Sequence, residues 1–260
     1  MAWRDLMTAP ASGTKESPLE SARFGCSIER LTVSGESGSS FSPVRAAILG
    51  SDADVIILRY PAERIDWFAK MTDLGRTTLL ADSLVYWRLA VGRGRGAEPS
   101  GDLWASELRD PAMVEALVLE VFARYESHYL ANPLFDAAEL PAGYAEWARR
   151  SAGEGGCLAL YARSAGEEPR VIGLATMQDD GPRTEILLAG VVPEVQGRGL
   201  YAHVLKAVED RARARGATEV VISTQGHHTR VQRAWARYGF EPVRTFFTVH
   251  LVRAGLLPPV

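Results

Sequence analysis

A short segment after an apolar run combines residue types that can bind an anion. In "VVPEVQGRGL", residues 191–200, two glycines stand one residue apart, and a helical pattern follows. A strand, a glycine loop and a helix start in this order aim free backbone N–H groups at one point, where the helix dipole adds positive charge. Gly197 and Gly199 let a ligand approach the backbone, and Gln196 and Arg198 can donate from side chains. We predict a phosphate site here; the alternative is a tight turn whose glycines only supply a positive φ.

Two common phosphate loops fit this segment poorly. "GRGLYA" satisfies the dinucleotide pattern G-x-G-x-x-G/A, but three residues separate Pro193 from the first glycine, and Glu219 stands at the start of the next strand instead of its end. The Walker A pattern G-x-x-x-x-G-K-[ST] is absent. A nicotinamide-dependent enzyme is therefore the least favoured interpretation.

The pattern V-x-P-x-x-Q-G-x-G resembles motif A of the GNAT acyltransferase superfamily, where Q/R-x-x-G-x-G/A wraps the pyrophosphate of acetyl-CoA. The matching residues are Gln196, Gly197, Arg198, Gly199 and Leu200, whereas Tyr201 stands at the last, usually small, position. The downstream strand "TEVVISTQ", helix ending "RYGFEPV" and strand "FFTVHLV" also resemble the closing half of that fold. The resemblance implies that acetyl-CoA is the cosubstrate and that residues 196–201 bind it.

The resemblance also implies how the rest of the cosubstrate is held. In that fold the strand before the loop splays from the next strand, and its exposed backbone binds pantetheine like an added strand. Val191 and Val192 are then the main-chain contacts. A strand that ends at a proline suits a place where sheet pairing stops.

Acyl transfer to an amine needs a neutral nucleophile, donors for the oxyanion and a route for protons. At the position where the superfamily often has a tyrosine acid, four residues before the glycine of the G-F turn, this chain has Trp235, which cannot protonate a thiolate. We predict His228, near a helix start, as a contact of the thioester arm and a proton donor or relay; the alternative is an exposed histidine in the cap. Glu185 is predicted as a base acting through water; the alternative is an acidic residue at an exposed strand start.

A looser similarity to sugar N-acetyltransferases of the TDP-fucosamine type runs through "FGCSIERL", "RYESHYLANPLF" and "STQGHHT". It implies that one helix carries Tyr125, His128, Tyr129 and Asn132 to the acceptor pocket, and that the acceptor is a primary amine on a nucleotide-linked amino sugar. In the alternative, Tyr129 and Leu130 pack in the core and His128 lies on the surface. Two other functions stay open, namely acetylation of another small amine (an amino acid or antibiotic) and non-catalytic sensing of acyl-CoA, which Trp235 favours.

Periodicity and turn signals place these residues in an α/β (α+β) chain. We expect a GNAT fold with a mixed, mostly antiparallel sheet flanked by helices, preceded by a smaller α/β domain. "GRGRGAEPSGD" is the strongest linker signal. The predicted parts are a loose leader (1–23), an N-terminal α/β domain (24–91), a glycine-rich linker (92–102) and the acetyltransferase domain (103–260).

The composition of the 260 residues excludes several classes of partner. A net charge of −3 argues against bulk electrostatic binding of nucleic acid. Cys26 and Cys157 are far apart and form no metal-ligand spacing, so neither a disulfide framework nor a metal site is expected. With no long apolar run, we expect a cytoplasmic protein that meets no membrane. Its expected partners are a small-molecule amine and acetyl-CoA, and a homodimer is left open.

Overall fold

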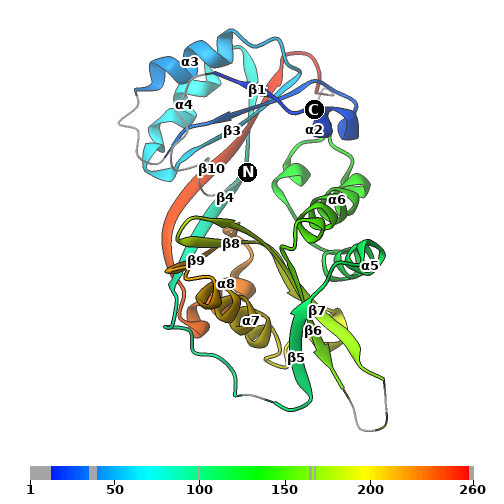
Figure 1. The fold of residues 1–260 in the computed structure, drawn as a ribbon. Coiled ribbons are helices and arrows are strands. Elements are labelled where there is room, and N and C mark those ends of the chain that lie inside the picture. Colours follow the sequence, from blue (N-terminus) through cyan, green and yellow to red (C-terminus); the bar gives the residue numbers. More distant parts are fainter. Residues whose placement is uncertain (1–12, 35–39, 99, 164–165, 167, 258–260) are drawn as a thin grey trace.

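The computed structural model describes all residues except 1–12, 35–39, 99, 164–165, 167 and 258–260. Its strands form one ten-stranded sheet in the order β1-β2-β3-β10-β4-β9-β8-β7-β6-β5 (Figure 1). Within the described ranges only β2 with β3 and β8 with β9 pair in parallel, and the other neighbours are antiparallel. The prediction of a mixed, mostly antiparallel sheet flanked by helices is confirmed.

The N-terminal half contributes the first four strands and three helices. Their bounds are β1 Lys15–Glu16, α2 Pro18–Phe24, β2 Ile28–Thr32, α3 Phe41–Leu49, β3 Val55–Pro61, α4 Asp66–Thr72 and β4 Arg76–Ala90. Of the predicted loose leader, residues 1–12 lie outside the described residues, but residues 15–24 form β1 and α2. Proline suits the first turn of a helix, because it lacks only an N–H that would have no partner there, so Pro18 starts α2 instead of marking a loop.

The C-terminal half contributes six strands and four longer helices among the described residues. Their bounds are β5 Leu103–Glu107, α5 Pro111–Val121, α6 Leu140–Gly153, β6 Cys157–Ala162, β7 Arg170–Asp180, β8 Arg183–Val191, α7 Tyr201–Ala214, β9 Glu219–Gln225, α8 Thr229–Tyr238 and β10 Glu241–Arg253. The apolar faces of α5, α6, α7 and α8 pack with β6 to β9 in one core cluster. None of the helices in the described ranges is long and apolar enough to cross a membrane.

Two long strands join the halves. β10 lies between β3 and β4, so a strand of the predicted acetyltransferase domain pairs with two strands of the predicted N-terminal domain (Figure 1). β4 in turn pairs with β9. The two halves therefore share one sheet, and the boundary at 92–102 stays a prediction.

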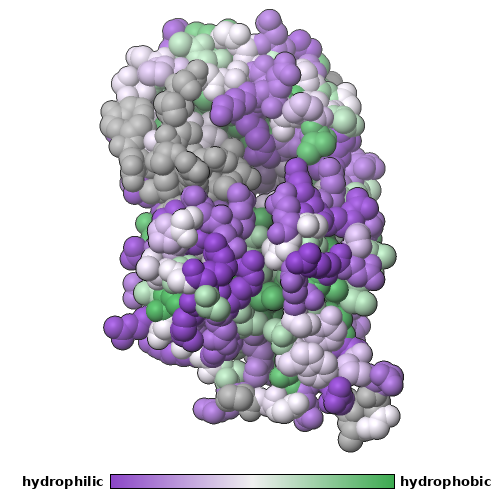
Figure 2. All heavy atoms as spheres, in the orientation of Figure 1, coloured by the Kyte–Doolittle hydropathy of each residue, from purple (hydrophilic) through white to green (hydrophobic). Residues whose placement is uncertain are grey.

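The face seen in Figure 2 is mainly hydrophilic. Its hydrophobic residues lie in small groups separated by polar ones, over the residues coloured in that view. Isolated groups of this kind are normal on a folded protein.

Candidate active site

The parallel pair β8 and β9 separates halfway along its length. Residues 183–186 pair with 219–222, and beyond that point β9 pairs only with β4 and β8 only with β7. At the separation, Leu187 is an extra residue in β8, since Leu188 pairs with Thr176 and Ile186 with the next residue of β7. A bulge of this kind bends a strand and increases its twist. The splay implied by the superfamily resemblance is therefore present in this chain.

The splay leaves one edge of β8 open. Val192 donates its backbone N–H to the Ile172 carbonyl at 2.9 Å, toward β7. Because partners alternate along an antiparallel strand, the backbones of Val191 and Ala189 face the opposite edge, toward the splay. Of the two predicted main-chain contacts, Val191 thus faces the opening, whereas the N–H of Val192 is occupied by sheet pairing. The Val191 carbonyl also accepts the Gln196 side chain at 3.3 Å.

The predicted anion loop directly follows β8. A short turn, Pro193–Val195, leads into Gln196, and α7 begins at Tyr201. Gly197 and Gly199 both have φ of +81°. A side chain built at Gly199 would meet no atom within 4 Å, so the space over the loop is open. A positive φ would be found in a simple tight turn as well. The open space in front of the helix start is the additional feature expected of an anion site.

The loop forms one end of a cleft of about 680 Å³, a volume typical of small-molecule sites. The predicted residues Val191, Gln196, Gly197, Gly199, Leu200 and Tyr201 line it, whereas Val192 and Arg198 do not. Three cations that sequence reasoning missed also line it, Arg95, Arg230 and Arg237. Arg230 and Arg237 are seven residues apart on α8, which places them on one helical face, so the spacing was a usable signal.

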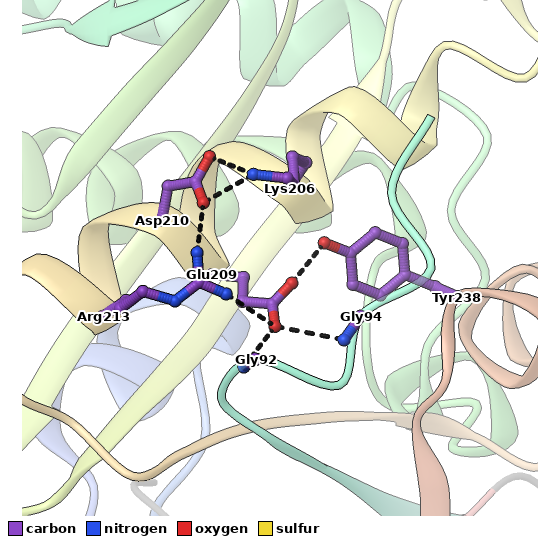
Figure 3. A network of polar contacts seen from close by, with 7 residues as sticks. All are labelled: Gly92, Gly94, Lys206, Glu209, Asp210, Arg213 and Tyr238. Atoms are coloured by element: carbon purple, nitrogen blue, oxygen red, sulfur yellow. Dashed lines mark hydrogen bonds and ion pairs between the residues drawn. The ribbon is translucent and has the colours of Figure 1, made fainter. Parts of the chain in front are cut away.

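A buried carboxylate on α7 anchors the segment that carries Arg95 (Figure 3). Glu209 accepts the backbone N–H groups of Gly92 at 2.7 Å and Gly94 at 3.1 Å, and the hydroxyl of Tyr238 at 2.7 Å. Arg95 donates its own N–H to the Tyr238 carbonyl at 2.6 Å. The first part of the predicted linker is therefore fixed against α7 and α8, at the wall of the cleft.

The large residue at the usually small position turns toward α8. Trp235 donates its indole N–H to the Tyr201 hydroxyl at 3.0 Å, and both side chains line the cleft. Burial raises the pKa of Tyr201, so its hydroxyl stays protonated. Trp235 is 2% exposed and can donate only a hydrogen bond.

His228 lies at the start of α8 and lines the same cleft. Its ring stacks on Tyr125 with centroids 4.5 Å apart, and its Nε2 lies 2.8 Å from the Glu126 carbonyl. A carbonyl only accepts, so Nε2 carries the proton and the neutral ring has its lone pair on Nδ1. Burial and the neighbouring His227 lower the pKa of His228 despite the carbonyl contact. This geometry suits a proton acceptor better than the predicted proton donor.

Glu185, the predicted base, lies outside both cavities. It is 7% exposed in the paired part of β8, opposite Gln178 of β7 and Val221 of β9. Neither the cleft nor the second cavity described below includes it in its lining. Glu185 and His228 therefore do not line a common cavity. The alternative, an acidic residue at an exposed strand start, is wrong because Glu185 is buried.

A second cavity of about 760 Å³ adjoins the cleft, and residues of both halves of the chain line it. Tyr125, Leu187, Leu188, Ser223 and Thr224 line both cavities, so the splayed ends of β8 and β9 form their common wall. At this wall Tyr125 donates its hydroxyl to the Gln225 side chain at 2.5 Å. The two spaces meet where the sheet opens.

Three of the four predicted acceptor residues line this second cavity, Tyr125, His128 and Tyr129. They are not on one helix, because α5 ends at Val121 and residues His128–Ala131 form a separate short turn. This break lets the chain place Tyr129 against Glu20 and Arg30 of the N-terminal half.

His128 and Asn132 are both buried. His128 is 7% exposed and its Nδ1 lies 2.9 Å from His250 Nε2, so the alternative of a surface histidine is wrong. Asn132 is 1% exposed and accepts the Leu134 N–H at 3.1 Å. It does not line the second cavity and has a structural role in its turn.

Comparison with known proteins agrees with this arrangement. Residues 119–240 match the model of the acetyltransferase (GNAT) family. No curated protein matches the sequence. Across the described ranges, no cluster of three or more ligating side chains that could hold a metal ion is present.

Solved structures share the fold at low sequence identity. A GCN5-related N-acetyltransferase from Sphaerobacter thermophilus aligns with a TM-score of 0.56 and 17% identity over 78% of this chain, which spans 61% of that protein. A functionally unknown conserved protein from Staphylococcus epidermidis ATCC 12228 gives 0.58 and 12%, with 97% of this chain and 98% of that one covered. A tandem GNAT protein from the clavulanic acid biosynthesis pathway gives 0.53 and 15%, covering 90% and 76%. Residues 119–240 thus resemble the GNAT acetyltransferase family in sequence, and the chain shares its fold with these solved structures.

Proposed function

We propose that the protein transfers an acetyl group from acetyl-CoA directly to a primary amine. The observation that carries the proposal is the common wall at Tyr125, Leu187, Leu188, Ser223 and Thr224. Acetyl-CoA in the cleft and an amine in the second cavity would meet there without a covalent enzyme intermediate. Holding two reactants in this way is itself a large part of catalysis.

The cleft offers complementary groups along the length of acetyl-CoA. The free amides around Gly197 and Gly199, with Arg230 beside Gly197, face the place for the pyrophosphate. Arg95 and Arg237 supply further positive charge for the remaining phosphate. The open backbone edge at Ala189 and Val191 can pair with the amides of pantetheine, as an added strand would.

His228 supplies the route for the proton. As the amine nitrogen bonds to the thioester carbon, the amine proton moves to Nδ1 of His228, and the carbon–sulfur bond then breaks to release the thiolate. A thiolate is a good leaving group, so the absence of a tyrosine at the position of Trp235 does not prevent the reaction. Glu185, which lines neither cavity, stays a candidate base that acts through water, and Glu185→Gln with full turnover would remove it from the mechanism.

The acceptor class is bounded by the second cavity. Its aromatic walls include Tyr86, Tyr129, Tyr144 and Trp147, which suit a ring or a sugar face. A nucleotide-linked amino sugar is our first candidate, and amino acids and amine-bearing antibiotics are the others.

A second function is favoured by one contact. The indole of Trp235 occupies the place of the usual acid and is bonded to Tyr201 inside the cleft, an arrangement that also suits a protein that binds acyl-CoA and senses it without turnover. A thiol-release assay with acetyl-CoA and a panel of amines separates the two functions. Turnover supports the enzyme, and tight binding without turnover supports the sensor.

The cofactor site is tested by Gly199→Asp, which places a negative charge and a Cβ in the open space over the loop. We expect acetyl-CoA binding, measured by calorimetry, to weaken at least about tenfold. Gly181→Asp is the matched control, since Gly181 has φ of +55° and also has no atom within 4 Å of a built Cβ, but lies in the β7–β8 turn. Equal affinities of the two variants would refute the loop assignment.

A further inference from the structure

The second cavity contains a buried cation that no carboxylate neutralises by contact. Arg59 on β3 is 8% exposed and lines the cavity. Its Nε donates to the Thr248 hydroxyl at 3.1 Å. Among the described residues Arg59 forms no ion pair. A buried charge without a partner is costly, and such groups gather at binding sites.

A second, half-buried arginine of this cavity has a partner. Arg30 pairs with Glu20 through two nitrogens, one of them Nε at 2.6 Å from the carboxylate. At the rim Arg23 pairs with Glu146 at 3.0 Å. Pairing thus removes these two cations as free ligands for an anion. Of the other cations that line the cavity, Lys15 and Arg150 are exposed, and Arg59 is buried.

None of the three neighbouring titratable groups, Asp82, His128 and His250, forms an ion pair with Arg59 among the described residues. Asp82 lies on β4 in the same row, since Thr248 pairs with both Arg59 and Asp82 across the sheet. Burial raises the pKa of Asp82, and Arg59 together with the side chains of Thr248 and Gln225 offsets only part of this rise. The buried pair His128 and His250 stays neutral, because burial and the nearby arginines lower both pKa values.

We propose that the acceptor amine carries an anionic group, a carboxylate or a phosphate, and that Arg59 binds this group. Arg59 is fixed by Thr248 at its Nε, so its terminal nitrogens can form the forked pair that guanidinium makes with oxyanions. The amine would lie at the common wall near Tyr125 and Thr224, three strands away across the sheet. The inference rests on the proposed function, and it names the class of substrate.

The test compares acceptors that differ only by the anion. Alanine is compared with alaninamide, and glucosamine 6-phosphate with glucosamine, in the thiol-release assay. We expect kcat/KM for the anionic member of at least one pair to exceed that of its neutral partner about tenfold or more. The pair that shows the ratio separates a carboxylate from a phosphate. Equal rates within both pairs would overturn the inference while leaving the acetyltransferase function intact.

Substitution assigns the preference to Arg59. Arg59→Met should bring the ratio of kcat/KM between the anionic and the neutral acceptor close to one, by raising KM for the anionic acceptor. The KM for acetyl-CoA should stay unchanged. Arg59→Lys keeps the charge and should keep part of the ratio. Arg88→Met, which removes an exposed cation of β4 that lines neither cavity, is the matched control and should have no effect. A ratio that survives in Arg59→Met refutes the assignment.

A binding measurement covers the case in which neither pair is acetylated. With the cleft saturated by CoA, inorganic phosphate should raise the melting temperature of the native protein and of Arg88→Met, but not that of Arg59→Met. The absence of this difference would overturn the inference. Failure of CoA itself to bind would instead contradict the proposed function.

Discussion

Replacement of Glu209 tests how the segment Gly92–Arg95 is held against the cleft. Its carboxylate is 1% exposed and accepts two backbone N–H groups and one hydroxyl (Figure 3). Alanine leaves these three donors without their acceptor. A hydrogen bond to a charged group contributes about 1.5–3 kcal/mol, and water entering the space recovers part of the loss. We expect Glu209→Ala to lower the free energy of unfolding by about 3–5 kcal/mol.

Glu209→Gln is the matched control. Its side-chain oxygen can still accept from Gly92 and Gly94, and its amide can donate to Tyr238, whose hydroxyl rotates. We expect a loss of about 1 kcal/mol, measured by urea unfolding. The affinity for acetyl-CoA should fall only in the alanine variant, because it releases the segment that carries Arg95. An alanine variant within about 0.5 kcal/mol of the native protein, or equal losses in both variants, would refute the reasoning.

Three further predictions concern the cavities and the join between the halves. His228→Gln should lower kcat about 100-fold without changing acetyl-CoA affinity. In the native protein, activity should fall at acidic pH as His228, whose pKa is lowered, becomes protonated, and this fall should be absent from the variant. Unchanged turnover of the variant from pH 6 to 9 would exclude His228 as the base. Burial alone would raise the pKa of Glu20, but Arg30 and neighbouring hydroxyls lower it from 4.5 to about 2. The ionised carboxylate therefore stabilises the fold fully above pH 4.5, and the free energy of unfolding should fall by about 3 kcal/mol as the pH falls toward 2. Acid titration of Glu20→Gln should lack that loss, and a curve parallel to the native one would contradict the coupling. Arg230→Ala should weaken acetyl-CoA binding and reduce its salt dependence, whereas Arg233→Ala, an exposed α8 residue outside the cleft, should not; equal effects would argue against Arg230.

The parts of the site that sequence predicted are local in the chain. The strand, glycine loop and helix from Val191 to Tyr201 follow one another directly, so residue type and spacing suffice to predict their order. The strand patterns "GCLALYAR" and "RVIGLATMQ" predict a hairpin for the same reason, and β6 and β7 pair antiparallel. The apolar stripe of "PAMVEALVLEVFARYESHY" predicts the helix α5 but not its end at Val121, because tertiary contacts of the segment after it decide where the helix stops.

The acceptor cavity depends on long-range pairing that spacing does not show. Arg59 and Thr248 are far apart in sequence and become neighbours because β10 inserts between β3 and β4. Nothing in the pattern around "DVIILRY" distinguishes a buried unpaired arginine from a surface one. The resemblance of "RYESHYLANPLF" to sugar N-acetyltransferases predicted Asn132 in the acceptor pocket. In the structure its side chain instead accepts the Leu134 N–H within a turn.

A crystal structure with acetyl-CoA soaked into the cleft tests the central claim most directly. The proposal predicts density for the pyrophosphate at the amides of Gly197 and Gly199, and for the thioester carbonyl at the common wall near Leu188 and Ser223, open to the second cavity. Density elsewhere, or a thioester sealed from the second cavity by Tyr125, would contradict direct transfer between the two spaces.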